Sequence, residues 1–216
     1  MVILLTAPSG IGKSTLLLGL ISQEGFEKSI GFITTEILIS NKTRIGFTMT
    51  NIKTKESGTI AHKQTTNNKF KVGDYYVNVA QILQVIKDIQ VDKSSILIID
   101  EIGGLQTISS DFKQFVRKNI NVAKFCIATI TCDTEVQLAN ELKQNPEFLL
   151  LNLTIDNRVW LMKVLAHLKS RSFEYDSISL EKRLEFNKKL ADYLKRPDSK
   201  FESALLKINE MLFFMK

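Results

Sequence analysis

The sequence has little cysteine and no apolar run long enough to cross a membrane. Of its 216 residues only Cys126 and Cys132 are cysteines, too few and too isolated for a disulfide framework or a zinc site. We expect both as small buried or half-buried residues. His62 and His167 likewise stand apart from any group of metal-ligating residues. The apolar stretch at the N-terminus is only a few residues long, which is typical of a core strand rather than of a signal peptide.

These absences leave a soluble, cytoplasmic protein without a membrane partner as the expected class. With 44% hydrophobic residues and a mass of 24.5 kDa, the chain can bury a core of ordinary size. We expect a monomer or a weak homo-oligomer.

Residues 7–15 read Ala-Pro-Ser-Gly-Ile-Gly-Lys-Ser-Thr, the pattern of a phosphate-binding loop. The loop follows the apolar run 2–5 and precedes an amphipathic helical pattern, so a strand, a turn and a helix come in the order that phosphate binding requires. Backbone N–H groups of such a loop and the positive end of the helix surround phosphate oxygens. We therefore assign nucleotide binding to nine consecutive residues: Ala7, Pro8, Ser9, Gly10, Ile11, Gly12, Lys13, Ser14 and Thr15.

Three positions of this loop carry specific expectations. Lys13 would reach the β- and γ-phosphates and take part in catalysis, and the Ser14 hydroxyl would ligate Mg²⁺. Ala7 replaces the first glycine of the usual G-x-x-x-x-G-K-[ST] pattern. This replacement is tolerable if φ of Ala7 is negative, because only Gly10 and Gly12 then need the freedom of glycine. A glycine-rich turn that matches by chance is the disfavoured alternative.

Two adjacent carboxylates, Asp100 and Glu101, end the apolar run 95–99. A continuous apolar strand of this length suits a parallel sheet covered on both faces, and its carboxyl end would lie beside the phosphate loop. Asp100 would hold the Mg²⁺ shell, in part through water. Glu101 would orient and deprotonate the attacking water. The alternative is a solvated acidic pair in a strand-to-loop turn.

Strands and helices alternate along the chain in the manner of α/β proteins. A Thr- and Lys-rich β region covers residues 30–78, and a helix opens near Asp156 or Asn157. The other expected elements are strands over 2–6, 95–100, 125–130 and 148–154 and helices over 13–23, 79–90, 109–119 and 134–143.

The β region carries the positive charge of the protein. Residues 28–71 contain eight basic residues against Glu36 and Glu56, a surplus that equals the net charge of +6 of the whole chain. Such a patch can attract nucleic acid, but its three phenylalanines are too scattered for a stacking platform. We favour the alternative that lysines on exposed hairpins prevent edge-to-edge aggregation. The basic residues are Lys28, Lys42, Arg44, Lys53, Lys55, Lys63, Lys69 and Lys71.

Five sequence blocks follow one another in order within residues 1–168. They are Ala7 to Thr15; Gly31 to Glu36 with Arg44 to Phe47; Val72 to Val77; Asp100 to Gly103 with Ser109 and Phe112; and Asn157 with Arg158. The set resembles the P-loop nucleoside-triphosphatase family known from hyperthermophiles, whose human member is called cancer-related nucleoside-triphosphatase. The resemblance implies a RecA-like or AAA-like core and slow, Mg²⁺-dependent hydrolysis of several nucleoside triphosphates to diphosphate and phosphate.

The sequence departs from that family near the expected phosphates. Leu38 stands where the family usually has Arg, and Gly104, Leu105 and Gln106 stand where it usually has Lys, Met and Glu. The fold expectation is unaffected. A cation and a carboxylate near the phosphates are missing, so undiminished turnover does not follow from the resemblance.

Residues 171–216 lie outside the resemblance and form a second expected unit beside the core 1–170. Ser199 as N-cap and Glu202 at N3 make a capping box behind Pro197. Apolar faces before and after Pro197 predict a helical hairpin. We favour a hairpin that covers the outer helices of the sheet; the alternative is that it docks a partner or a second copy of the chain. These faces consist of Leu180, Leu184, Leu190, Tyr193 and Leu194, and of Phe201, Ala204, Leu205, Ile208, Met211, Leu212 and Met215.

Arg158 is the third expected catalytic residue. It follows the strand 148–154 and should therefore lie at the same carboxyl edge of the sheet as the phosphate loop. There it could stabilise charge on the γ-phosphate, which is worth about 10³–10⁵ in rate in known cases. The alternative is that its guanidinium stacks on the base or holds the start of the next helix.

The expected fold is an α/β P-loop NTPase, a RecA-like or AAA-like three-layer sandwich with a basic β-hairpin region and an appended C-terminal helical hairpin. The expected function is Mg²⁺-dependent hydrolysis of nucleoside triphosphates, with ATP accepted and GTP, CTP and UTP competing, because a guanine-reading Asn-Lys-x-Asp motif is absent. A nucleoside or nucleotide kinase shares the phosphate loop but usually carries an arginine-rich lid. A nucleotide-gated binding module with weak hydrolysis is the remaining alternative.

Overall fold

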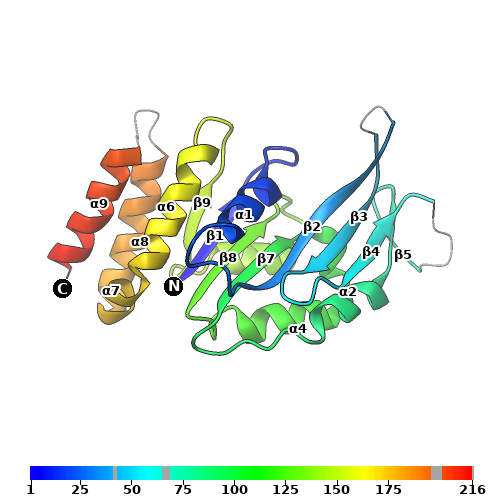
Figure 1. Ribbon diagram of the computed structural model, residues 1–216, viewed down its shortest axis with the longest axis horizontal. Coiled ribbons are helices and arrows are strands. Elements are labelled where there is room, and N and C mark those ends of the chain that lie inside the picture. The colour runs from blue at the N-terminus through cyan, green and yellow to red at the C-terminus, as the bar shows by residue number, and fades with distance from the viewer. Residues whose placement is uncertain (41–42, 65–68, 196–200, 216) are drawn as a thin grey trace.

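A nine-stranded sheet runs through the part of the molecule that the structure, a computed structural model, describes (Figure 1). The described residues are 1–40, 43–64, 69–195 and 201–215. Five neighbouring strands of the sheet are parallel. In spatial order they are β2 (Ile30–Ile39), β7 (Ile96–Ile102), β8 (Phe125–Ile130), β1 (Val2–Thr6) and β9 (Leu149–Asn152).

The other four strands extend the sheet beyond β2 and pair antiparallel. They follow β2 in the spatial order β3 (Thr43–Asn51), β4 (Ser57–His62), β6 (Tyr75–Val77) and β5 (Phe70–Val72). Six of the eight basic residues counted in the β region, Arg44, Lys53, Lys55, Lys63, Lys69 and Lys71, lie on these strands and their turns. The basic β-hairpin region therefore forms one end of the sheet.

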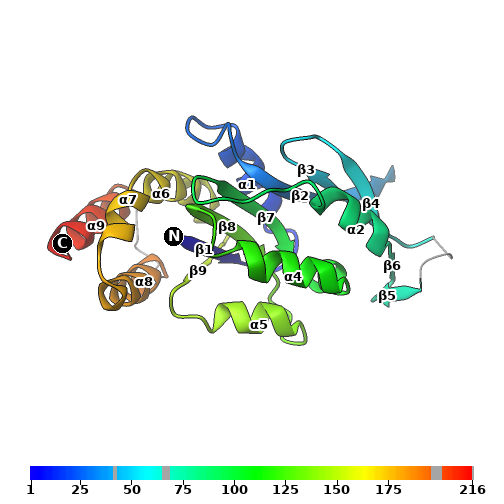
Figure 2. The same ribbon diagram turned by 90° about the horizontal axis from the view of Figure 1, so that it is seen from below.

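Helices cover both faces of the sheet, as the alternation along β1 requires. Ile3 and Leu5 point to one face, where they pack in one cluster with α1 and α6, and Val2 and Leu4 point to the other, where they pack with α2, α4 and α5 (Figure 2). The expected three-layer α/β sandwich is thus confirmed. The helices are α1 (Lys13–Ile21), α2 (Val79–Ile86), α4 (Ser110–Asn119), α5 (Gln137–Lys143) and α6 (Arg158–Ser170), with the short α3 (Gly104–Thr107) directly after β7.

The C-terminal helices α7 (Ser172–Ser177), α8 (Leu180–Leu194) and α9 (Phe201–Phe214) lie at the β9 end of the sheet (Figure 1). α8 contacts β9, and α9 contacts α6 and α8. Leu190 of α8 and Ile208 of α9 are fully buried in the same hydrophobic cluster as Leu149 of β9. The helices therefore extend the core of the sandwich instead of enclosing a separate one.

Two expectations about exposure were wrong. Cys132 is exposed, because β8 already ends at Ile130 and the chain leaves the sheet there; only Cys126 is buried. Leu180, expected on the apolar face of its helix, is exposed because it is the first residue of α8.

Several element ends also differ from the expected ones. α5 begins at Gln137 rather than near residue 134, since the Thr131 and Asp133 side chains accept bonds from the N–H groups of Asp133 and Glu135 and hold that segment in turns. β7 continues to Ile102. The capping box expected from Ser199 behind Pro197 lies outside the described residues.

Among the described residues, no helix is both long enough and apolar enough to cross a membrane.

Candidate functional site

The phosphate-binding loop connects β1 to α1, at the carboxyl edge of the parallel strands. Gly10 and Gly12 have φ of 82° and 101°, which only glycine adopts readily. Ala7 does not have a positive φ, and its small side chain is buried. Alanine is therefore compatible with the first position of the loop.

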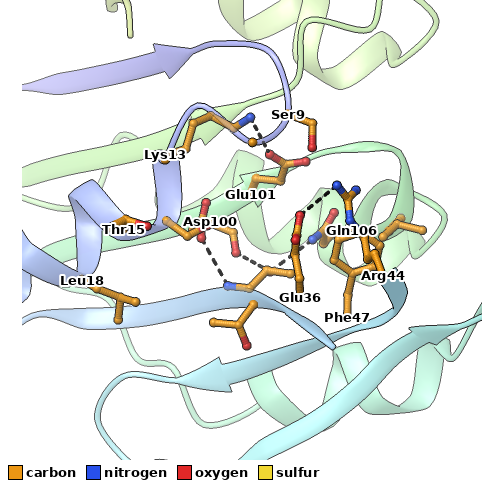
Figure 3. A pocket seen from close by; sticks show the side chains of 16 residues that line it. Ser9, Lys13, Thr15, Leu18, Glu36, Arg44, Phe47, Asp100, Glu101 and Gln106 are labelled. Atoms are coloured by element: carbon orange, nitrogen blue, oxygen red, sulfur yellow. Dashed lines mark hydrogen bonds and ion pairs between the residues drawn. The ribbon is translucent and has the colours of Figure 1, made fainter. Parts of the chain in front are cut away.

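The Lys13 ammonium is held by the loop itself and faces a carboxylate. Its Nζ donates hydrogen bonds to the carbonyl oxygens of Ala7 (3.0 Å) and Pro8 (3.4 Å). Nζ also lies 3.5 Å from Oε2 of Glu101 (Figure 3). A cation from the loop and a carboxylate from the end of β7 thus share one side of the pocket.

Asp100, one residue before Glu101 on β7, is almost completely buried, with an exposed fraction of 1%. Its carboxylate accepts hydrogen bonds from the Thr129 hydroxyl and from the backbone N–H of Thr34 at 3.4 Å. Burial raises the pKa of Asp100 to about 6, and hydrogen bonds from Ser14 and Thr129 oppose this rise.

The donor set around Asp100 fits Mg²⁺. The Ser14 hydroxyl at the start of α1 and the Asp100 carboxylate are in hydrogen-bond contact, so two oxygen ligands lie together beside the phosphate loop. Mg²⁺ prefers few protein oxygens and takes its remaining ligands from water and phosphate. No group of three or more His, Cys, Asp and Glu that could form an all-protein metal site occurs in the described part of the chain.

A pocket of about 410 Å³ opens in front of these residues (Figure 3). Six of the nine expected loop residues line it, whereas Ala7, Pro8 and Ile11 do not; the first two instead offer their carbonyls to Lys13. The lining residues are Ser9, Gly10, Gly12, Lys13, Ser14, Thr15, Leu18, Thr34, Thr35, Glu36, Arg44, Phe47, Asp100, Glu101, Leu105 and Gln106.

Of the wall opposite the loop, the sequence indicated only Glu36, as the next candidate for the base after Glu101; Arg44 and Phe47 were not identified as part of the site. Glu36 of β2 and Arg44 of β3 form an ion pair at 3.0 Å, and the Arg44 guanidinium lies 5.4 Å from the centroid of the Phe47 ring. The signal that could have found Arg44 and Phe47 is their position in the second sequence block of the family resemblance, beside Glu36. Its residues meet in space because β2 and β3 pair antiparallel with Glu36 opposite Phe47.

Arg158 lies on the other side of the loop. A methyl group on Gly12 would lie 3.5 Å from Nη1 of Arg158, so the guanidinium packs against the loop backbone. Arg158 does not line the pocket. It begins α6, where the buried Asn157 joins two chain segments by accepting from the Thr154 N–H (2.9 Å) and donating to the Asn152 carbonyl (2.9 Å). Whether Arg158 stabilises charge on the γ-phosphate or binds the nucleotide base stays a prediction.

Comparison with known proteins agrees with this geometry. A family model described as NTPase matches residues 2–166. The nucleoside-triphosphatase THEP1 of Aquifex aeolicus is 30% identical over 185 residues, which are 79% of this chain and 100% of that protein.

Two solved structures have the same fold. The crystal structure of THEP1 from Aquifex aeolicus superimposes with a TM-score of 0.65 at 28% identity and covers 76% of this chain and 96% of its own. The solution structure of a human cancer-related nucleoside triphosphatase gives 0.62 at 23% identity, with 78% and 97% covered. The second likeness concerns the fold alone.

Proposed function

The chain belongs to this NTPase family, and we propose that it hydrolyses the bond between the β- and γ-phosphates of nucleoside 5′-triphosphates in a Mg²⁺-dependent reaction. The products are the nucleoside diphosphate and phosphate. The observation that carries the proposal is the position of Glu101, whose carboxylate lies beside the loop cation Lys13 in the pocket that the phosphate loop lines.

The residues have distinct roles in this reaction. Loop N–H groups and the Lys13 ammonium bind the β- and γ-phosphates and stabilise the charge that builds up on them. Ser14 and Asp100 hold the metal ion, which supplies further neutralisation of that charge when bound. Glu101 takes a proton from the water whose oxygen attacks the γ-phosphorus, and the electron pair of the broken P–O bond leaves with the diphosphate.

We infer a broad choice of bases and slow turnover. Beyond the loop, the lining of the pocket includes the apolar side chains of Leu18, Phe47 and Leu105, which offer no hydrogen bonds that would select one base. ATP, GTP, CTP and UTP are therefore all expected substrates. Leu38 supplies no cation and Gln106 supplies no carboxylate near the phosphates, and both departures favour slow turnover.

Steady-state phosphate release from each of the four triphosphates tests the proposal, with Mg²⁺ and with EDTA in place of the metal. We expect release from all four that stops without Mg²⁺. Parallel reactions with added nucleosides or nucleoside monophosphates test the kinase alternative. Transfer of phosphate to an acceptor, at the expense of free phosphate, would contradict the proposal. A near-silent basal rate that RNA or a protein partner stimulates would favour the binding module instead.

A further inference from the structure

Gln106 is a buried amide with an unused acceptor at the wall of the pocket. It lies on α3, directly after the carboxylates of β7, and only 1% of its surface is exposed. Its Oε1 has no hydrogen-bond partner within the part of the chain that the structure describes. Buried polar atoms without a partner are few in native proteins, and each calls for a physical reason.

The orientation of this amide follows from the single proton of the Thr34 hydroxyl. Thr34 Oγ1 donates that proton to the backbone carbonyl of Asp100, so only a donor can face it from the other side. The Gln106 Nε2 group supplies this donor at 3.3 Å. Oε1 must therefore point away from Thr34, and the amide cannot be turned over without losing the bond.

Oε1 of Gln106 and Oε1 of Glu101 both lie close to Gly103. A methyl group on Gly103 would lie 2.7 Å from the Glu101 oxygen and 3.3 Å from the Gln106 oxygen, so the two oxygens are at most 6.0 Å apart. One bent water molecule that donates a hydrogen to each takes acceptor oxygens about 4.5 Å apart at ordinary hydrogen-bond lengths of about 2.8 Å. The upper limit of 6.0 Å includes this separation, so the structure permits a shared water.

We propose that Gln106 orients the attacking water together with Glu101. This inference rests on the proposed hydrolysis. The water donates one hydrogen to Glu101, which takes the proton, and the other to Oε1 of Gln106, which only holds it. A lone pair of the water oxygen is then directed at the γ-phosphorus. The amide is uncharged and takes no proton, so its whole contribution is geometric.

A glutamate could not replace Gln106 in this arrangement. Its carboxylate has no proton for Thr34 Oγ1, and it would add a negative charge beside Asp100 and Glu101. Glutamine at this position therefore supplies both the donor to Thr34 and an acceptor near Glu101.

Gln106→Leu tests the inference, because it keeps the size of the side chain and removes the acceptor. Gln106→Met is the second variant, in case the branched side chain does not fit, and Gln114→Leu on the exposed face of α4 is the matched control. Phosphate release gives kcat and KM. Binding of a fluorescent ADP is measured with beryllium fluoride, which imitates the bound γ-phosphate, and with aluminium fluoride, which imitates the transition state and includes the attacking water.

We expect kcat of the Leu and Met variants to fall about 10²-fold, the scale of one lost transition-state hydrogen bond. KM and the beryllium fluoride complex should stay within two-fold of wild type, the aluminium fluoride complex should weaken by about the factor lost in kcat, and thermal unfolding should not move to lower temperature. Gln114→Leu should match wild type throughout.

Unchanged kcat in both variants, or equal weakening of the two fluoride complexes, would overturn the inference. A wild-type enzyme that releases no phosphate would refute the proposed function itself, which is a different result from an active enzyme that is indifferent to Gln106.

Discussion

Lys13 Nζ and Glu101 Oε2 lie 3.5 Å apart, although the two residues belong to the first and the seventh strand-loop units of the chain. The contact pairs the cation of the phosphate loop with the expected base. Both side chains are partly shielded from solvent, with exposed fractions of 11% and 33%. A triphosphate that binds Lys13 therefore lies beside the carboxylate that we propose as the base.

Replacement of Lys13 by Ala should abolish turnover and weaken nucleotide affinity, because the ammonium that the loop carbonyls hold toward the phosphates is lost. Phosphate release and titration with a fluorescent nucleotide measure the two effects. The exposed Lys118→Ala on α4 is the control for a general loss of charge. Hydrolysis at the wild-type rate in Lys13→Ala would remove this loop from the site.

Glu101→Gln should keep Mg²⁺-nucleotide binding, since the amide preserves the shape of the side chain, while kcat falls by about 10²–10⁴-fold. Asp100→Asn should instead raise the Mg²⁺ concentration needed for half-maximal activity, because it removes the charged ligand. Metal titrations of both variants separate the two effects. If Glu101→Gln stays within a few-fold of wild type, Glu36 is the next candidate for the base.

Arg158→Ala distinguishes two roles for the guanidinium that packs on Gly12. If Arg158 stabilises charge in the transition state, kcat falls with little change in nucleotide affinity; if it binds the base, affinity falls and kcat is retained. We expect the loss in kcat. Measurement of kcat, KM and the dissociation constant of a non-hydrolysable analogue decides the matter. Three unchanged parameters would exclude Arg158 from the site.

Leu190→Ala should lower the free energy of unfolding of the whole protein by about 2–5 kcal/mol, because it leaves a cavity in the cluster that α8 shares with β9. The measurement is denaturant unfolding followed by far-UV circular dichroism. Leu206→Ala on the exposed side of α9 is the matched control and should change stability by less than about 0.5 kcal/mol. A separate early transition of the C-terminal helices, with the core unaffected, would contradict a shared core.

Only one of the two cysteines should react with a thiol reagent in the native protein. Burial raises the pKa of Cys126 to about 12, so its reactive thiolate does not form at pH 8, whereas Cys132 is exposed. Ellman's reagent should count one thiol under native conditions and two in denaturant, and Cys132→Ser should leave none that reacts before unfolding. Rapid labelling of two native thiols would show that Cys126 is accessible.

The phosphate loop and the strand that carries Asp100 could be predicted because each is a local pattern. Glycines that need positive φ, a lysine and a flanking apolar strand all fall within a dozen residues, and parallel strands place their carboxyl ends together. The family resemblance and the α/β sandwich rest on such local patterns, and both were confirmed.

The opposite wall could not be predicted locally, because it depends on strand register. β2 and β3 shift register between Ile37 and Leu38, and the shift determines that Arg44 pairs with Leu38 in the ladder while its guanidinium reaches Glu36. Gln106 was noticed only as a departure from relatives. Its fixed orientation follows from its hydrogen bond to Thr34, which lies 72 residues away in sequence and donates its own proton to the Asp100 carbonyl.

The path of β2 separates two tasks within the pocket. β2 pairs with β7 only through Ile30, Gly31 and Phe32, and its later residues pair with β3 alone. Glu36 and its partner Arg44 are thus carried on the antiparallel part of the sheet, whereas Asp100 and Glu101 are anchored in the parallel core. Substitutions on that part of the sheet can therefore change one wall of the pocket without disturbing the strand that carries the two carboxylates.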